Sequence, residues 1–66
     1  MKKIKPDYSS LEEGDIIFAY VKRCPNDVFP AYYQGYDKNW DEYQWTDGDG
    51  SLFSDKELVF VDIKKY

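Results

Sequence analysis

The apolar residues of this chain fall into five short runs that are separated by turn-forming residues. Along the first run, residues 15–21, successive side chains alternate between two sides of a strand, and both sides are largely apolar. A strand with two apolar sides is typical of a barrel or of a sheet that is partly covered on both faces. The same pattern predicts four further strands, at residues 31–36, 40–46, 51–53 and 58–63.

The segments between these runs carry strong turn signals. Residues 22–30 contain two prolines, which fix the backbone and withhold hydrogen-bond donors, so a loop is predicted there. Residues 37–39 predict a tight turn, and the Asp-Gly-Asp-Gly sequence at 47–50 can adopt the positive φ angles of a sharp turn. At 54–57, a serine followed three residues later by glutamate forms a capping-box pattern, which predicts a single 3₁₀ or α turn before the last strand.

Chain length and element pattern together predict one small domain. A chain of 66 residues can bury only about 60% of the surface that its unfolded form exposes, so its stability is expected to be marginal. Five short strands, closely spaced turns and the lack of an amphipathic helix predict an all-β fold, namely a small five-stranded barrel with a short 3₁₀ turn before its last strand. The single domain is expected to span residues 1–66, with the barrel at about 12–63.

Composition excludes several classes of site. The chain has no histidine and one cysteine, Cys24, so it lacks the usual zinc ligand sets, a Ser-His or Cys-His nucleophile pair and an intramolecular disulfide. The carboxylates Asp47 and Asp49 stand in a glycine turn, where acids far more often form the turn than bind metal or transfer protons. We therefore predict a protein that is not an enzyme, needs no cofactor and resides in the reducing cytoplasm.

The formal net charge of −4 is concentrated in one segment. Residues 37–57 hold seven acids against two lysines, a charge of −5. Such a surface repels a phosphate backbone, so duplex nucleic acid is a poor partner and a basic protein is a better one. An acidic face is equally often only a solvated face, and the sequence leaves both interpretations open. No apolar run approaches the roughly 18 residues needed to cross a bilayer, so no membrane partner is expected.

Three of the strand segments resemble the strand signatures of a known family. Residues 14–20, 32–35 and 43–49, followed by Leu58, are similar to Tudor-like domains, and the match covers roughly residues 12–63 in the same order. The resemblance implies an SH3-like barrel. It also implies an aromatic cage for a methylated lysine or arginine, because a methylammonium group keeps its charge but is poorly hydrated and packs well against ring faces.

The resemblance implies cage roles for four residues of this chain. Tyr20, Tyr33 and Trp45 fall at the positions of the cage rings, and Asp47 falls at the position of the acid that accepts a hydrogen bond or neutralises the cation. Asp49 stands where many such cages have another aromatic residue. An alternative role for Tyr20 and Trp45 is core packing, since small barrels use one or two aromatic side chains as their main packing mass.

A second set of residues is expected on an outward aromatic and acidic face, where a protein partner would bind. Tyrosine and tryptophan are enriched at protein-binding surfaces, especially near their centres. The alternative is that these rings only shield strand edges. The predicted partner-binding residues are Tyr36, Trp40, Asp41, Glu42, Tyr43 and Asp49.

The sequence therefore predicts a non-enzymatic protein-binding module that contacts a cationic or methylated side chain through an aromatic and acidic face. A rival prediction is a free-standing small acidic protein, such as a phage or mobile-element inhibitor, that masks a basic nucleic-acid-binding surface on a host protein. The chain begins at Met1 and ends just after its last predicted strand, as expected for a complete reading frame. A structural accessory subunit is the third possibility.

Overall fold

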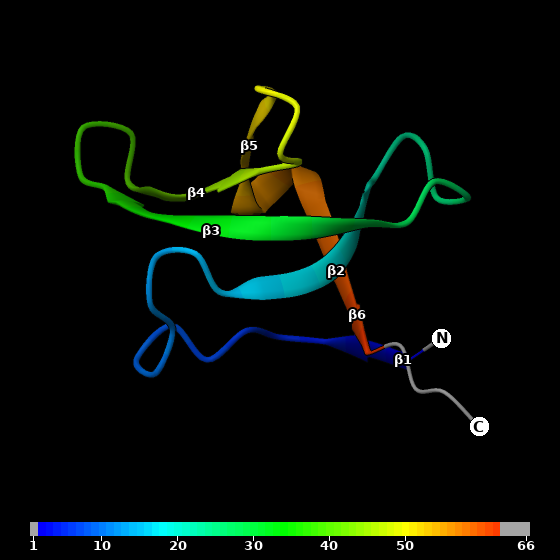
Figure 1. Cartoon of the computed structure of the whole chain (residues 1–66), viewed down its shortest axis with the longest axis horizontal. Helices are drawn as coiled ribbons and strands as arrows, with labels where there is room; N and C mark the ends of the chain where they lie inside the picture. The colour runs from blue at the N-terminus through cyan, green and yellow to red at the C-terminus, as the bar shows by residue number, and fades with distance from the viewer. Residues whose placement is uncertain (1, 63–66) are drawn as a thin grey trace.

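Short strands joined by turns build one antiparallel sheet (Figure 1). The computed structural model describes residues 2–62. The elements are β1 (Lys2–Ile4), β2 (Ile16–Val21), β3 (Phe29–Asp37), β4 (Glu42–Thr46), β5 (Leu52–Ser54), the 3₁₀ turn η1 (Asp55–Glu57) and β6 (Leu58–Asp62). The strand order across the sheet is β1-β6-β2-β3-β4-β5. No helix in this part of the chain is long and apolar enough to span a membrane.

The all-β prediction and the 3₁₀ turn before the last strand are confirmed, but the strand count is wrong. The sheet has six strands and is not closed into a barrel. The extra strand, β1, pairs with β6, where Ile4 lies opposite Phe60. Its sequence, Lys-Lys-Ile, has no alternating pattern, so only this pairing with the far end of the chain makes it a strand. Residue 63 of the predicted last strand lies outside the described residues.

The loop predicted at residues 22–30 is shorter than expected, because β3 already begins at Phe29 and includes Pro30. Pro30 lies opposite Phe18 of β2, whereas β4 pairs with β3 only from Tyr32 onward. At Pro30 the strand therefore has a neighbour on one side only, and a residue without an N–H donor is tolerated there.

One side of the sheet carries the core. Cross-strand partners share a side, so the pairs Tyr33–Trp45 and Ala19–Phe60 place four buried side chains together. Trp45 is the largest fully buried side chain. In Figure 1, β6 runs steeply across β2 and β3, as expected for a strongly twisted sheet. The buried cluster comprises Ala19, Ala31, Tyr33, Trp45, Leu58 and Phe60.

The turn η1 is held by the capping box that the sequence predicts. The Ser54 hydroxyl accepts a hydrogen bond from the Lys56 N–H at 3.2 Å, and the Glu57 carboxylate accepts one from the Ser54 N–H at 3.1 Å. These bonds satisfy N–H groups that the short turn leaves without partners. They thereby fix the angle at which the chain passes from β5 into β6.

Substituting Ser54 by alanine is therefore expected to lower the free energy of unfolding by about 1 kcal/mol, the usual effect of losing an N-cap side chain. Urea unfolding measures this loss. Ser51→Ala is the matched control, because Ser51 is exposed and precedes β5 without capping a turn. Equal stability of the two variants would contradict a stabilising role for the cap.

Candidate functional site

The structure does not bring the three predicted cage rings together. Trp45 is completely buried and Tyr33 is only 6% exposed, and both belong to the core cluster. Tyr20 follows the buried Ala19 on β2, so its side chain points to the opposite side of the sheet. Trp45 therefore has the core-packing role that the sequence offered as the alternative. A ring cage of Tyr20, Tyr33 and Trp45 is accordingly not formed.

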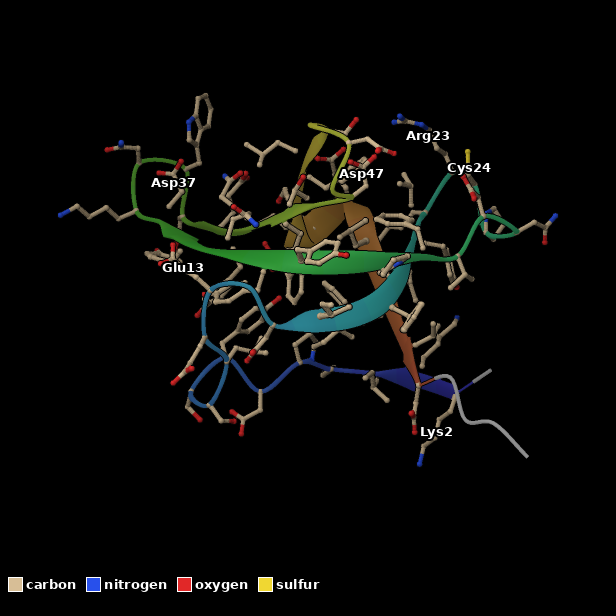
Figure 2. The ribbon with its side chains drawn as sticks, in the orientation of Figure 1. Lys2, Glu13, Arg23, Cys24, Asp37 and Asp47 are labelled. Atoms are coloured by element: carbon tan, nitrogen blue, oxygen red, sulfur yellow. The ribbon has the colours of Figure 1, made fainter. Side chains whose placement is uncertain are left out.

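Asp47 and Asp49 lie in the turn between β4 and β5, where Figure 2 shows Asp47. An Asp47 side-chain oxygen accepts hydrogen bonds from the Asp49 N–H at 2.8 Å and from the Ser51 N–H at 3.3 Å. Both bonds stabilise the turn, which is the ordinary use of aspartate in this position. Among the described residues no group of three histidine, cysteine or acidic side chains could hold a metal ion.

A tyrosine that the sequence did not single out, Tyr8, covers one end of the core. Its ring stacks on Tyr43 with the centroids 3.6 Å apart and the planes 8° apart, and it also contacts Tyr33 and Trp45. The segment that carries Tyr8 is fixed to β3, because the Gly14 N–H donates to the Tyr33 carbonyl at 2.8 Å. No local pattern predicts this placement, since Tyr8 lies in a loop.

Burial changes the acidity of this ring cluster. Desolvation raises the pKa of Tyr8 to about 12, the nearby Trp45 indole opposes this shift, and the Asp55 carboxylate adds to it. Burial also raises the pKa of Tyr33. The buried Trp45 Nε1 makes no hydrogen bond to any described residue. The cluster is therefore built from neutral rings, and ionising a tyrosine within it is unfavourable.

Beside Tyr8, two hydroxyls organise the turn that presents it. Ser9 and Ser10 donate hydrogen bonds to the two carboxylate oxygens of Asp7, at 2.6 and 2.8 Å. These bonds lower the pKa of Asp7, because they favour its charged form. The Ser10 N–H also donates to the Asp7 carbonyl at 3.1 Å. Asp7 thus acts as a turn former.

The predicted aromatic and acidic face is found partly at the loop between β3 and β4. The Tyr36 hydroxyl donates a hydrogen bond to a carboxylate oxygen of Asp41, and this bond is the main reason why the pKa of Tyr36 is raised. Asp41 adopts a φ angle of 51°, which the turn requires. Trp40, at the tip of the loop, is 71% exposed. The loop is held in shape while its indole stays available.

A groove of about 450 Å³ opens beside this loop, over β4, β5 and η1. Its lining combines carboxylates, amides and an exposed indole with the apolar side chains of Leu52 and Phe53. No lysine or arginine is among the lining residues that the structure describes. The polar and aromatic lining residues besides Phe53 are Gln34, Asp37, Trp40, Glu42, Gln44, Ser54 and Glu57.

The three carboxylates of the groove come from three different elements. Asp37 ends β3 and lies directly opposite Glu42, which begins β4. Like charges in such a pair are destabilising. Glu42 accepts a hydrogen bond from the Gln44 amide at 2.9 Å, whereas Glu57 is held by the Ser54 N–H. The arrangement concentrates negative charge at one place and fixes its position.

The structure places the predicted partner-binding residues in different parts of the molecule. Trp40 and Glu42 line the groove, and Tyr36 and Asp41 shape the loop beside it. Tyr43 points to the other side of the sheet, into the ring cluster. Asp49 stays in the exposed β4–β5 turn. Sequence reasoning missed Asp37 and Glu57 as site residues, because Glu57 carries only a capping signal and Asp37 only a turn signal.

Comparisons of the chain with protein-family models, with curated proteins and with solved structures found no match. The chemistry of the groove is therefore the basis on which its function is argued.

Proposed function

We propose that this chain is a non-enzymatic binding module whose acidic groove receives a cationic side chain of a protein partner. One observation carries the proposal. Asp37, Glu42 and Glu57 line the same groove as the exposed indole of Trp40, and no lysine or arginine is among the described lining residues. An unneutralised cluster of this kind favours a ligand that brings positive charge.

The indole and the carboxylates act on different parts of such a ligand. A cation over the face of tryptophan gains about 0.5–1 kcal/mol at an exposed site and more when it loses water. The carboxylates accept hydrogen bonds from the charged head, and each has capacity beyond the single bond it already makes. Leu52, which is 63% exposed, offers apolar contact to the aliphatic stem. Lysine and arginine both have this combination of stem and charged head.

The Tudor-like resemblance remains a finer part of the proposal. It is supported by the run of neighbours β6-β2-β3-β4-β5 with η1 placed before β6, although the sheet is not closed into a barrel. A methylated side chain is the finer ligand proposal, and Trp40 takes the aromatic role that the resemblance gave to Tyr20, Tyr33 and Trp45. A cytoplasmic location is supported by the single free thiol of Cys24.

A purely acidic contact is the second candidate, in which the protein masks a basic surface of a host protein. It is favoured by the position of the remaining acids, since Asp41 and Asp49 are exposed in the two loops that flank β4. In that case charge alone steers and holds the partner, and the binding weakens strongly with salt. An indole contact would be nearly independent of salt.

The test is an NMR titration of the full chain with four otherwise identical short peptides. Their central residue is lysine, trimethyllysine, arginine or glutamine. We expect the three cationic peptides to shift the Trp40 indole resonance and the backbone resonances of Glu42 and Glu57, because these groups line the groove. Trimethyllysine should bind more tightly than lysine if the indole dominates.

Two variants separate the contributions. Glu42→Gln is expected to weaken binding of the cationic peptides about three- to tenfold, and Trp40→Ala by a similar factor. Asp27→Asn is the matched control, since Asp27 is an exposed acid in the loop before β3, away from the groove lining. If the glutamine peptide binds as well as the others, the proposal is wrong. If Glu42→Gln weakens binding and Trp40→Ala does not, the purely acidic contact is favoured.

A further inference from the structure

The side of the sheet that faces away from the core is also apolar. The register places Ile16 opposite Tyr32, Phe18 opposite Pro30, and Tyr20 opposite Val59, and cross-strand partners share a side. We call this surface the outer face. It consists of Ile16 and Phe18, which are exposed, and of Tyr20, Pro30, Tyr32 and Val59, which are half-buried. Val61 lies on the same side but is only 3% exposed.

The outer face has the composition of an interface rather than of a solvated surface. Ile16 is 50% exposed and Phe18 is 40% exposed, at the centre of the sheet. An antiparallel sheet with one packed side normally carries polar residues on the other. Within the described strands β2 and β6, every position that points to this side is apolar or tyrosine. Polar residues begin at the margins, with Lys3 on β1 and Thr46 on β4.

The two margins of the outer face carry opposite charges. On the β1 side Lys3 and Lys5 are exposed, whereas Lys2 alternates to the other side of β1 and lies opposite Asp62. At the opposite margin the β4–β5 turn lies against the outer face, because a Cβ atom added to Gly48 would lie 3.3 Å from the Tyr32 ring. Asp49 is exposed in this turn. Figure 2 shows Lys2 at the lower edge of the view and Asp47 at the upper edge. The outer face is therefore flanked by Lys3 and Lys5 at one margin and by Asp49 at the opposite one.

We propose that a second copy of this chain covers the outer face, so that two sheets pack face to face in a symmetric dimer. A two-fold axis parallel to the strands sets the β1 margin of each copy against the β4–β5 margin of the other. Lysines then meet acids twice, while the uncharged centre of each sheet is buried. A uniformly basic partner would match only the acidic margin and would meet the lysines of β1 with like charge.

This inference goes beyond the groove, which lies further along over β4 and β5 and has different lining residues. The test is sedimentation velocity of the full-length chain over a range of concentrations. We expect a concentration-dependent dimer. Phe18→Asp should raise the dimer dissociation constant at least a hundredfold, because it would bury a charge without a partner. Circular dichroism checks that the variant folds, and Trp40→Ala should leave the dissociation constant unchanged.

A charge-exchange experiment tests the orientation. The double variant Lys3→Glu with Lys5→Glu, and separately Asp49→Lys, should each raise the dissociation constant about tenfold, because each sets like charges together at both contacts. Mixing the two variants should restore a tight heterodimer. A wild-type protein that stays monomeric overturns the inference and leaves the outer face to another protein. A dimer that survives Phe18→Asp, or a mixture that fails to recover affinity, overturns it as well. The groove opens on the same side of the sheet, because Thr46 and Leu52 share the side of Tyr32. The peptide titration is therefore repeated with the Phe18→Asp variant, in which binding to the groove is measured without the dimer.

Discussion

Substituting Trp45 by alanine is expected to lower the free energy of unfolding by about 3–5 kcal/mol, which is enough to unfold much of the protein at 25 °C. Trp45 is the largest fully buried side chain and lies 4.7 Å from the Phe60 ring and 5.1 Å from the Tyr33 ring, centroid to centroid. Truncation would leave a cavity at the centre of the core. Urea unfolding followed by far-ultraviolet circular dichroism measures the loss.

The chain provides a matched control, since its other tryptophan, Trp40, is 71% exposed. Trp40→Ala makes the same chemical change and should alter stability by no more than about 0.5 kcal/mol. Trp45→Phe should be milder than Trp45→Ala, because it keeps a ring in place and removes the Nε1 donor that lacks a partner in the described structure. Similar losses from Trp45→Ala and Trp40→Ala would contradict the core assignment.

The strands were predictable wherever a short apolar run stands between turn-forming residues. The runs that became β2 and β6 both fit this description, because both sides of these strands are largely apolar. The capping box at Ser54 was equally readable, since all of its bonds lie within four residues. β1 was not readable, because it exists only through pairing with β6 at the other end of the chain.

The site was predictable only in part, for a related reason. The composition of residues 37–57 points to an acidic and aromatic face, and Trp40 and Glu42 do line the groove. Their binding role stays a prediction. Which side of a strand faces the core depends on register, and this sends Tyr43 inward while Glu42 faces the groove. Glu57 lines the same groove only because the fold places η1 next to β4.

Tyr8 shows the same limit most clearly. It lies in a loop, so no periodicity indicates that it packs on Tyr43. Its contacts with Tyr33 and Trp45 follow from the way in which residues 7–15 cross the end of the core and bond to β3. Once that crossing is known, the partial burial of Tyr8 and its raised pKa follow directly.

Raising the pH through the range from 10 to 12 is expected to destabilise the protein through Tyr8. Burial raises the pKa of Tyr8 from 10.0 to about 12 in the folded state, so the unfolded state ionises first. The stability that depends on neutral Tyr8 is therefore complete below pH 10 and is lost as the pH rises towards 12. A shift of this size corresponds to about 2.7 kcal/mol, and screening at the partly exposed ring reduces the expected loss to about 1–2 kcal/mol.

Urea unfolding at a series of pH values from neutral to above 11 measures this dependence. Tyr33 also has a raised pKa, so the wild-type protein should lose stability through both tyrosines. Tyr8→Phe keeps the stacked ring but cannot ionise, and its stability should fall less steeply with pH than that of the wild type. If Tyr8→Phe and the wild type lose stability in parallel, the Tyr8 hydroxyl is not buried against the core in the way the structure shows.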